Sequence, residues 1–408
     1  EYSGAVTLPE SVTYNGKTYR VTSIGEYAFR DCSRLTSINI PNSITSIPRY
    51  DTFKGCSGLE ELILNVSQID LWFNKNTTIK KVILGEDVKI IGRLAFSGCS
   101  SLTSINIPQS VTSIGSSAFE DCSSLTCITI PNVNYIAEKT FFGCKNLTSV
   151  NIPKSVTSIG DDAFYNCRSL TSITIPKSVT SIGDDAFYGC SCLYKVINNS
   201  NLPLSVGSDS HGRIAYYSKI VIEGSKLSTI GDFQFYTDKG IHYLTNYVGQ
   251  SASVVLPDNY NGENYEIFDY AFAGLINLTI IDIPYGITSI GEGAFYNCHN
   301  LVSVCIPESV TSIAAYAFYD NRNLESLNIP EELVTIGDRA FYGCEKIRSL
   351  TIPRNVTSIG KFAFLYCHSL SRIIVDSDNS VYDSREDCNA IIETGSNTLI
   401  LGCSVTDI

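Results

Sequence analysis

The chain has 408 residues, 44% of them apolar, with 41 acidic and 29 basic side chains and a formal net charge of −12. A phosphate-binding surface needs a stripe or run of positive charge, and the sequence has none, which argues against a nucleic-acid ligand. No segment approaches the roughly 18 consecutive apolar residues of a membrane span. We therefore expect no membrane insertion in this segment, and the length allows two or three domains or one elongated array.

The word Ala-Phe, followed by Cys three residues later and Leu six residues later, recurs along the chain with some variation. The spacing is mostly 23 residues, and thirteen units can be counted, including a degenerate copy marked by Phe73. A unit this short cannot bury its own apolar side, whereas stacked units can, so the period predicts a solenoid. The other marker phenylalanines are Phe29, Phe53, Phe96, Phe119, Phe141, Phe164, Phe187, Phe272, Phe295, Phe318, Phe341 and Phe364.

Within one unit, residues 170–175 alternate apolar and polar, which predicts a short strand that Pro176 ends. Residues 179–182 form a second short extended segment. A turn follows, and we expect Asp184 or Asp185 to cap a brief helical turn that carries the Ala-Phe word inward. The expected fold class is α/β to mostly β, a solenoid with short strands and short helical turns.

These words, Leu-x-x-Ile-x-Ile-Pro and Ile-Gly-x-x-Ala-Phe-x-x-Cys in a 23-residue unit, resemble the BspA-like leucine-rich repeats of bacterial cell-surface proteins. The resemblance extends over about three quarters of the chain. It implies a right-handed solenoid on the surface of host-associated, often anaerobic, bacteria. Members of the family whose role is known act as adhesins toward host matrix proteins or other microbes.

Two arrays are expected, because the period fails for 85 residues between Phe187 and Phe272. Asn15-Gly16 and Asn261-Gly262 each lie between β-rich runs that lead into a repeat, and this pattern predicts two hairpin caps. The predicted domains are a first array at 1–193, a β-rich connecting segment at 194–252 with a hairpin turning at 238–240, and a second array at 253–408 with a divergent last repeat. The relative orientation of the arrays, the oligomeric state, and further repeats or an anchor after Ile408 stay open.

Ten of the 15 cysteines occupy one repeat position, three residues after the phenylalanine. We expect this row to be buried, reduced and free of metal, because a line of single thiols does not surround an ion tetrahedrally. The row comprises Cys32, Cys56, Cys99, Cys122, Cys144, Cys167, Cys190, Cys298, Cys344 and Cys367; outside it are Cys127, Cys192, Cys305, Cys388 and Cys403, of which Cys127 and Cys305 should face outward.

Catalytic chemistry has no positive sign in the sequence: we predict no catalytic residue, no cofactor and no metal. His299 and His368 directly follow cysteines of the row, but adjacent residues point apart. Asp376, Asp378, Ser380 and Asp387 match positions of a calcium loop, although Val381 stands where such a loop needs Gly, so calcium is only an alternative to a solvated turn.

Three surfaces are candidates for binding. The outward strand positions form a polar ladder that suits a solvated sheet, a protein partner or, less well, a glycan, and the tyrosines after the marker phenylalanine form a second stripe. The degenerate coil at 65–84 carries the only tryptophan of the chain and is the predicted ligand site, with Trp72, Phe73, Glu60, Glu61, Lys80 and Lys81; space filling by Trp72 is the alternative. The polar ladder comprises Ser37, Asn39, Ser104, Asn106, Ser149, Asn151, Ser172, Thr174, Ser326, Asn328, Ser349 and Thr351, and the stripe comprises Tyr165, Tyr188, Tyr296, Tyr319 and Tyr342.

We therefore expect an extracellular, cell-surface, adhesin-like binding protein whose partner is a protein on a host or microbial surface, with a glycan as another candidate. The alternatives are a structural spacer or stalk that presents another domain, and, third, a glycan-processing enzyme.

The chain contains no Met, and the step from Phe119 to Phe141 is 22 residues. One interpretation is that methionines of the natural chain are missing from the printed sequence, one of them near Asn132; the other is a true one-residue deletion.

Overall fold

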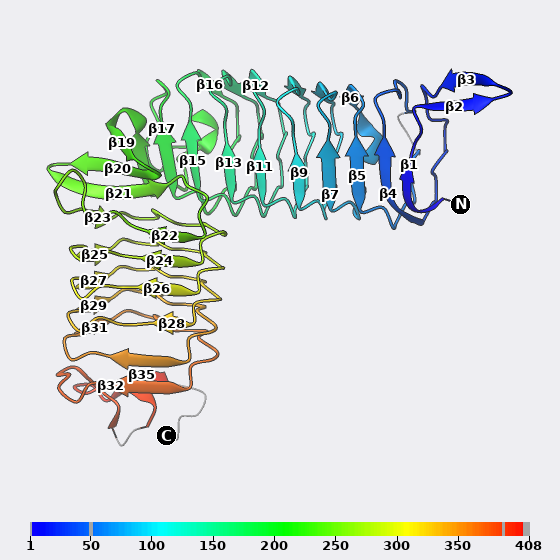
Figure 1. Ribbon diagram of the computed structural model, residues 1–408. Helices are drawn as coiled ribbons and strands as arrows, with labels where there is room; N and C mark the ends of the chain where they lie inside the picture. Colours follow the sequence, from blue (N-terminus) through cyan, green and yellow to red (C-terminus); the bar gives the residue numbers. More distant parts are fainter. Residues whose placement is uncertain (1, 49–51, 386–387, 403–408) are drawn as a thin grey trace. The chain divides into compact units, whose positions relative to one another are not determined.

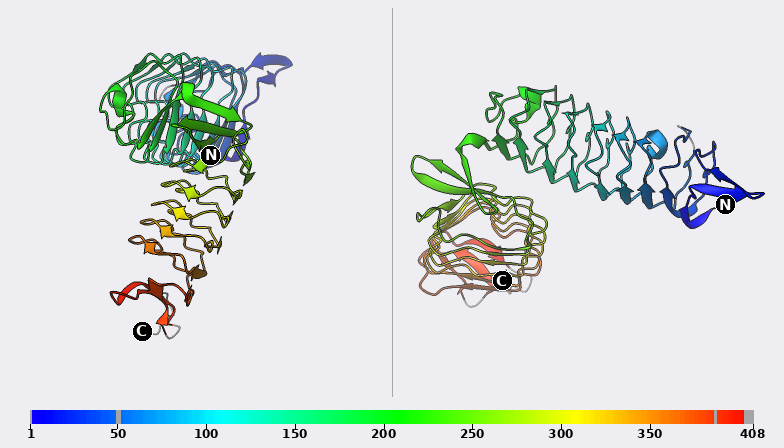
Figure 2. Two further views of the ribbon diagram at one scale, coloured as in Figure 1. Left: turned by 90° about the vertical axis from the view of Figure 1, so that its left-hand side faces the viewer. Right: turned by 45° about the horizontal axis from the view of Figure 1, so that its top comes forward.

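The computed structural model describes residues 2–48, 52–385 and 388–402. The chain divides into two compact units, Glu1–Ser225 and Lys226–Ile408, and each is described by itself. The division falls inside the segment predicted to connect two arrays, so the hairpin expected at 238–240 belongs to the second unit. In Figure 2 each unit is seen nearly end-on in one of the views, and its successive coils superpose around one interior.

The first unit is built from short parallel strands in two stacks (Figure 1). Along one side lie β1 (Ser3–Thr7), β4 (Arg34–Ile40), β5 (Glu61–Leu64), β7 (Lys81–Leu84), β9 (Ser104–Asn106), β11 (Cys127–Thr129), β13 (Ser149–Asn151), β15 (Ser172–Ile175), β17 (Lys195–Asn198) and β18 (Ile220–Glu223). The other stack holds β6 (Gln68–Ile69), β8 (Ile90–Ile91), β10 (Ser113–Ile114), β12 (Tyr135–Ile136), β14 (Ser158–Ile159) and β16 (Ser181–Ile182). An antiparallel hairpin, β2 (Ser11–Tyr14) and β3 (Lys17–Arg20), lies near the N-terminal end.

The second unit repeats this plan. One stack comprises β22 (Ser253–Val255), β24 (Ile280–Asp282), β26 (Ser303–Cys305), β28 (Ser326–Leu327), β30 (Ser349–Ile352) and β32 (Arg372–Val375). The other comprises β23 (Glu266–Ile267), β25 (Ser289–Ile290), β27 (Ser312–Ile313), β29 (Thr335–Ile336) and β31 (Ser358–Ile359), and it is extended by β19 (Leu227–Ile230), β20 (Phe233–Asp238) and β21 (Ile241–Tyr247). A three-stranded antiparallel sheet follows: β33 (Tyr382–Asp383), β34 (Ala390–Glu393) and β35 (Thr398–Gly402).

The helical turns predicted at the Ala-Phe words are not present. The helices of the described residues are three short 3-10 segments, η1 (Leu71–Phe73), η2 (His211–Arg213) and η3 (Gly224–Lys226), and none of them lies at an Ala-Phe word. Left-handed residues flank the word in each coil, such as Asp185 with φ 50° and Gly189 with φ 77° around Phe187, and they interrupt a right-handed helix. The amide of Phe164 donates to the Ala186 carbonyl of the next coil at 2.7 Å, so this bond runs between coils. The fold is therefore a mostly β solenoid.

The marker phenylalanines stack on one another in the interior of both units. Centroids of neighbouring rings in the second unit lie 5.0 to 5.3 Å apart, with interplanar angles of 2° to 12°. Phe164 and Phe341 are both fully buried, as the repeat assignment requires. Stacked rings with the surrounding Leu and Ile side chains form one core in each unit.

The predicted cysteine row is buried, and the described cysteines are all unpaired. Nine of the ten members donate Sγ–H to a marker-phenylalanine carbonyl of an earlier coil, at 2.9 to 3.3 Å. Asn321 takes this position in one coil, and its Nδ2 donates to the Phe295 carbonyl at 3.0 Å. Burial raises the pKa of the Cys56 thiol to about 11 and that of Cys99 to about 12, so these thiols stay neutral at ordinary pH. Cys403 lies outside the described residues.

Two of the predicted turns have the expected geometry. Asn15 and Gly16 have φ of 50° and 74° and join β2 to β3, and Lys239 and Gly240, at 50° and 82°, join β20 to β21. The second Asn-Gly cap, at Asn261, is a single bridge rather than a stranded hairpin.

The 22-residue coil closes through a 2.6 Å bond from the Val133 amide to the Pro131 carbonyl and keeps its ring in the phenylalanine stack. Whether methionines are missing from the printed sequence is a question for mass measurement.

Candidate functional site

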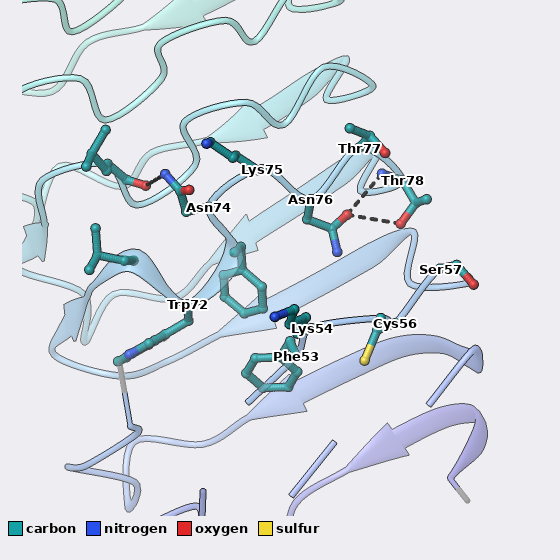
Figure 3. Close-up of a pocket in the computed structure, with 14 residues that line it drawn as sticks. Phe53, Lys54, Cys56, Ser57, Trp72, Asn74, Lys75, Asn76, Thr77 and Thr78 are labelled. Carbon is teal, nitrogen blue, oxygen red and sulfur yellow. Dashed lines mark hydrogen bonds between the residues drawn. The ribbon is translucent and has the colours of Figure 1, made fainter. Parts of the chain in front are cut away.

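The degenerate coil is an irregularity in the first unit. It is 20 residues from Phe53 to Phe73, and η1 delivers Phe73 into the stack, with its ring 5.0 Å from Phe53 and 6.3 Å from Phe96. Because the coil is short, its turn does not cover the neighbouring turn completely. A pocket of about 610 Å³ opens there, which we call the notch (Figure 3). It is lined by residues 53–57, residues 71–78 and Leu94.

Trp72 and Phe73 form the aromatic part of the notch. Phe73 is buried and belongs to the core, whereas Trp72 is half-buried, and its ring meets Phe73 edge-on at 6.4 Å. The Trp72 Nε1 atom is shielded from solvent and has no hydrogen-bond partner among the described residues. An indole N–H without a partner costs free energy when buried, and this cost offsets part of what the packing of Trp72 contributes to stability.

Polar side chains line the opposite wall. Asn76 occupies the row position of the cysteines, three residues after Phe73. Its Oδ1 accepts hydrogen bonds from the backbone amides of Thr78 and Ile79 at 2.9 and 3.1 Å. With the oxygen held in this way, the Asn76 amino group points toward the notch in Figure 3. The side-chain Nδ2 of Asn74 donates to the Leu94 carbonyl at 3.5 Å, and both residues line the notch. The described lining contains lysines but no carboxylate.

Of the six predicted site residues, Trp72 and Phe73 line the notch, and the four charged residues do not. Glu60 and Glu61 face Lys80 and Lys81 along the adjacent strands β5 and β7, with N–O distances of 2.7 and 2.9 Å. Exposed pairs of this kind contribute about 0–1 kcal/mol. The sequence placed these charges near Trp72, but strand pairing turns them into two bridges on the sheet. Asn74 and Asn76 were missed; the signal for Asn76 was an asparagine where the repeat has Cys, and the sequence gives none for Asn74.

Parts of the other two surfaces are engaged in contacts between coils. Tyr296, Tyr319 and Tyr342 stack at 4.8 and 4.7 Å with interplanar angles of 4°, so their ring faces cover one another and only edges remain for a ligand. In the polar ladder, the Asn106 Oδ1 accepts from the Leu84 amide at 3.0 Å, and Asn328 donates to the Ile306 carbonyl at 3.0 Å. These asparagines join neighbouring coils. Cys127 and Cys305 are exposed, as predicted.

The side chains of Cys298 and His299 contact different groups. Cys298 points to the Phe272 carbonyl, while His299 Nδ1 lies 2.9 Å from the carbonyl oxygen of Asp320. No group of three or more His, Cys, Asp or Glu side chains in the described part of the chain has the geometry to hold a metal ion. At the calcium-like loop, the Asp376 Oδ1 accepts from the Asp378 amide at 2.8 Å, and Asp387 lies outside the described residues. The described helices include none that is long and apolar enough to cross a membrane.

Coils of parallel strands around a ladder of phenylalanines and cysteines define a leucine-rich-repeat solenoid. The profile of the BspA type leucine rich repeat region matches residues 10–126, 67–194, 123–242 and 265–388. The chain therefore belongs to the BspA-type leucine-rich-repeat family.

Several solved structures are similar to the chain. A leucine rich cell surface protein of Faecalibacterium prausnitzii is 30% identical, covering 93% of this chain and 89% of that one, with a TM-score of 0.38. A leucine-rich repeat protein of Bacteroides ovatus is 25% identical, covering 94% and 89%, with a TM-score of 0.35. The leucine-rich repeat protein of T. pallidum is 28% identical over 36% of this chain and 70% of its own, with a TM-score of 0.35. No curated protein matched the chain significantly.

Proposed function

We propose that this chain is an adhesin-like binding protein of the bacterial cell surface, that its ligand is a protein on a host or microbial surface, and that the notch at Trp72 is its main contact. The observation that carries the proposal is the contrast between coils. In regular coils the marker rings stack on those of the neighbouring coil, and asparagines such as Asn106 and Asn328 bond to it, whereas the short coil leaves an open pocket with a half-buried tryptophan. A division into arrays at 1–193 and 253–408, joined by 194–252, is part of the proposal.

The side chains of the notch suit a protein ligand. Trp72 offers part of an apolar ring, and tryptophan is among the residues most enriched at binding hot spots. Asn76 offers a donor whose direction is set by the bonds of its oxygen. Since Lys75 is exposed at the rim and the described lining holds no carboxylate, an acidic segment is preferred over a basic one. A structural spacer has no use for such an opening, and no feature of the described residues favours an enzyme.

The test is capture of ligands by the purified full chain from a panel of host-matrix proteins, with a glycan array in parallel. We expect a protein to be captured and Trp72→Ala to weaken its binding by about tenfold or more. Because Trp72 also packs against the core, Lys75→Glu serves as a second variant at the exposed rim and should weaken an acidic ligand. Tyr285→Ala is the matched control, since Tyr285 is 79% exposed and lies in the other unit.

Three results would count against the proposal. If Trp72→Ala and Lys75→Glu bind a captured protein as well as the wild type does, the notch is not the contact, and the polar ladder becomes the better candidate. Capture on the glycan array alone would replace the protein ligand by a glycan. Capture of nothing at all would favour the spacer. A thermal melt of each variant shows whether its fold is intact.

A further inference from the structure

One six-residue word occurs twice in the chain and has two different environments. Residues 14–19 and 260–265 both read Tyr-Asn-Gly-x-x-Tyr, and each precedes the first Ala-Phe word of its unit. The two Asn-Gly turns have the same left-handed geometry. In both turns the residue before Asn pairs with the residue after Gly: Tyr14 pairs with Lys17, and Tyr260 bridges Glu263. The word is thus one structural element used in both units, and its surroundings can be compared position by position.

In the second unit this element is covered by the sheet of β19, β20 and β21. The Phe235 ring of β20 lies 4.6 Å from the ring of Tyr260 and 5.2 Å from that of Tyr265, and Tyr265 is only 2% exposed. His242 of β21 places Nε2 2.7 Å from the Glu263 carboxylate. An aromatic residue between the two tyrosines and a basic residue opposite the turn are therefore the two side chains by which the cover recognises the word.

In the first unit no element of the described residues covers the same word. Its arm is longer, with six residues from Pro9 to Asn15 against four from Pro257 to Asn261, so the hairpin of β2 and β3 extends away from the stack (Figure 1).

Strand pairing puts four side chains on one face of this hairpin, because Val12 pairs with Tyr19 and Tyr14 with Lys17. Val12, Tyr14 and Tyr19 are 47%, 69% and 51% exposed. Among the described strands, β2 and β3 pair only with each other. The hairpin therefore presents an apolar face and two open strand edges.

We propose that this face, Val12, Tyr14, Lys17 and Tyr19, docks a β-hairpin of a partner protein that carries an aromatic residue at the place of Phe235 and a carboxylate at the place of His242. The aromatic residue follows from the two tyrosines that the first unit shares with the second. The carboxylate follows from the charge at the turn, where Lys17 stands in place of Glu263. This surface is independent of the notch, which lies in another coil.

A second copy of this chain fits the face less well than such a partner. Its segment 227–247 would bring His242 against Lys17, which offers no opposite charge. The same segment is already engaged with Tyr260 and Tyr265 of its own unit. Sheet edges and aromatic pockets together are a common way for a protein to bind an extended segment of another.

The test uses the full chain and two synthetic peptides that span residues 227–247, one with the natural sequence and one with His242→Glu. The His242→Glu peptide should bind the wild-type chain about fivefold more tightly than the natural peptide, since a surface ion pair contributes little more. Lys17→Glu in the chain should reverse that order. Tyr14→Ser with Tyr19→Ser should weaken both peptides by about tenfold, whereas Tyr285→Ser should change neither. Hydrogen exchange should slow at residues 11–20 when the peptide is bound.

Failure of both peptides to bind would overturn the proposal, as would binding that survives the loss of Tyr14 and Tyr19. If the natural and the His242→Glu peptide bind the wild-type chain equally well, and also bind the Lys17→Glu chain equally well, the partner's carboxylate is refuted. Sedimentation that shows self-association of the wild type, lost in Tyr14→Ser, would identify a second copy as the occupant and would also overturn it. These side chains are exposed, so the variants should melt with the wild type, and none of these outcomes depends on the notch.

Discussion

Asn321 provides a direct test of what the cysteine row does. Its side chain is fully buried, its Nδ2 takes over the bond to the Phe295 carbonyl, and its Oδ1 has no partner among the described residues. A buried acceptor without a partner costs about 1–3 kcal/mol. Asn321→Cys removes that oxygen and still leaves a donor for the Phe295 carbonyl, as Cys298 and Cys344 show in the flanking coils at 3.0 and 3.2 Å.

We therefore expect Asn321→Cys to stabilise the second unit by about 1 kcal/mol, because a thiol is a weaker donor than an amide and offsets part of the gain. For a unit of this size, that corresponds to a rise in melting temperature of about 2–4 °C. Asn321→Ala removes the donor as well, and it should lower the stability by about 2 kcal/mol through the unsatisfied carbonyl and the small cavity.

The assay is calorimetry resolved into two transitions, together with hydrogen exchange of residues 295–324. Fluorescence of the only tryptophan, Trp72, follows the first unit and serves as an internal control that should not change. The reasoning is refuted if Asn321→Cys melts below the wild type, or if Asn321→Ala melts with it. Either result would mean that the row position contributes volume alone and that its hydrogen bond to the preceding ring's carbonyl is not needed.

Further predictions follow from the same contacts. Cys127 and Cys305 should be alkylated at pH 8 long before the row thiols, which native mass spectrometry measures; labelling of all cysteines at one rate would contradict the burial. Since burial raises the pKa of thiols such as Cys99 from 9.0 to about 12, their contribution to stability is complete below pH 9 and is lost as the pH rises toward 12, so circular dichroism should show alkaline unfolding. Phe341→Ala should cost about 3–5 kcal/mol in chemical denaturation, and a loss below 1 kcal/mol would argue against the ring stack. Peptide mass spectrometry of the protein from its natural source should find the segment between Phe119 and Phe141 heavier by one methionine residue if one is missing near Asn132, and a match to the printed residues would leave the deletion.

Much of the fold could be predicted because the repeat encodes local choices that stacking then reinforces. The burial of Phe164 and Phe341, the turns at Asn15 and Lys239 and the cysteine row all follow from residue type and spacing. The brief helical turns were wrong because the sequence shows Asp185 as a capping residue, while its left-handed backbone is set by the hydrogen bonds between coils.

The site was predictable only in part. An unusual tryptophan in a coil of irregular length marks Trp72 and Phe73, and both line the notch. The charges Glu61 and Lys81, near in sequence, are drawn away from it because strand register pairs them across β5 and β7. The role of Asn76 depends on which way its carboxamide turns, and that is decided by neighbouring amides rather than by the residue itself.

The sequence by itself determined the period, the buried side of each coil and the family, since a 23-residue spacing of Phe, Cys and Ile leaves stacking as the way to bury them. Only the tertiary structure decided which surfaces remain available. Tyr296, Tyr319 and Tyr342 of the tyrosine stripe stack on one another, the word at 260–265 is covered by Phe235, and the same word at 14–19 is exposed. The physical reason is that burial depends on what an element packs against, and identical residues have different surroundings when the segments that pack against them differ.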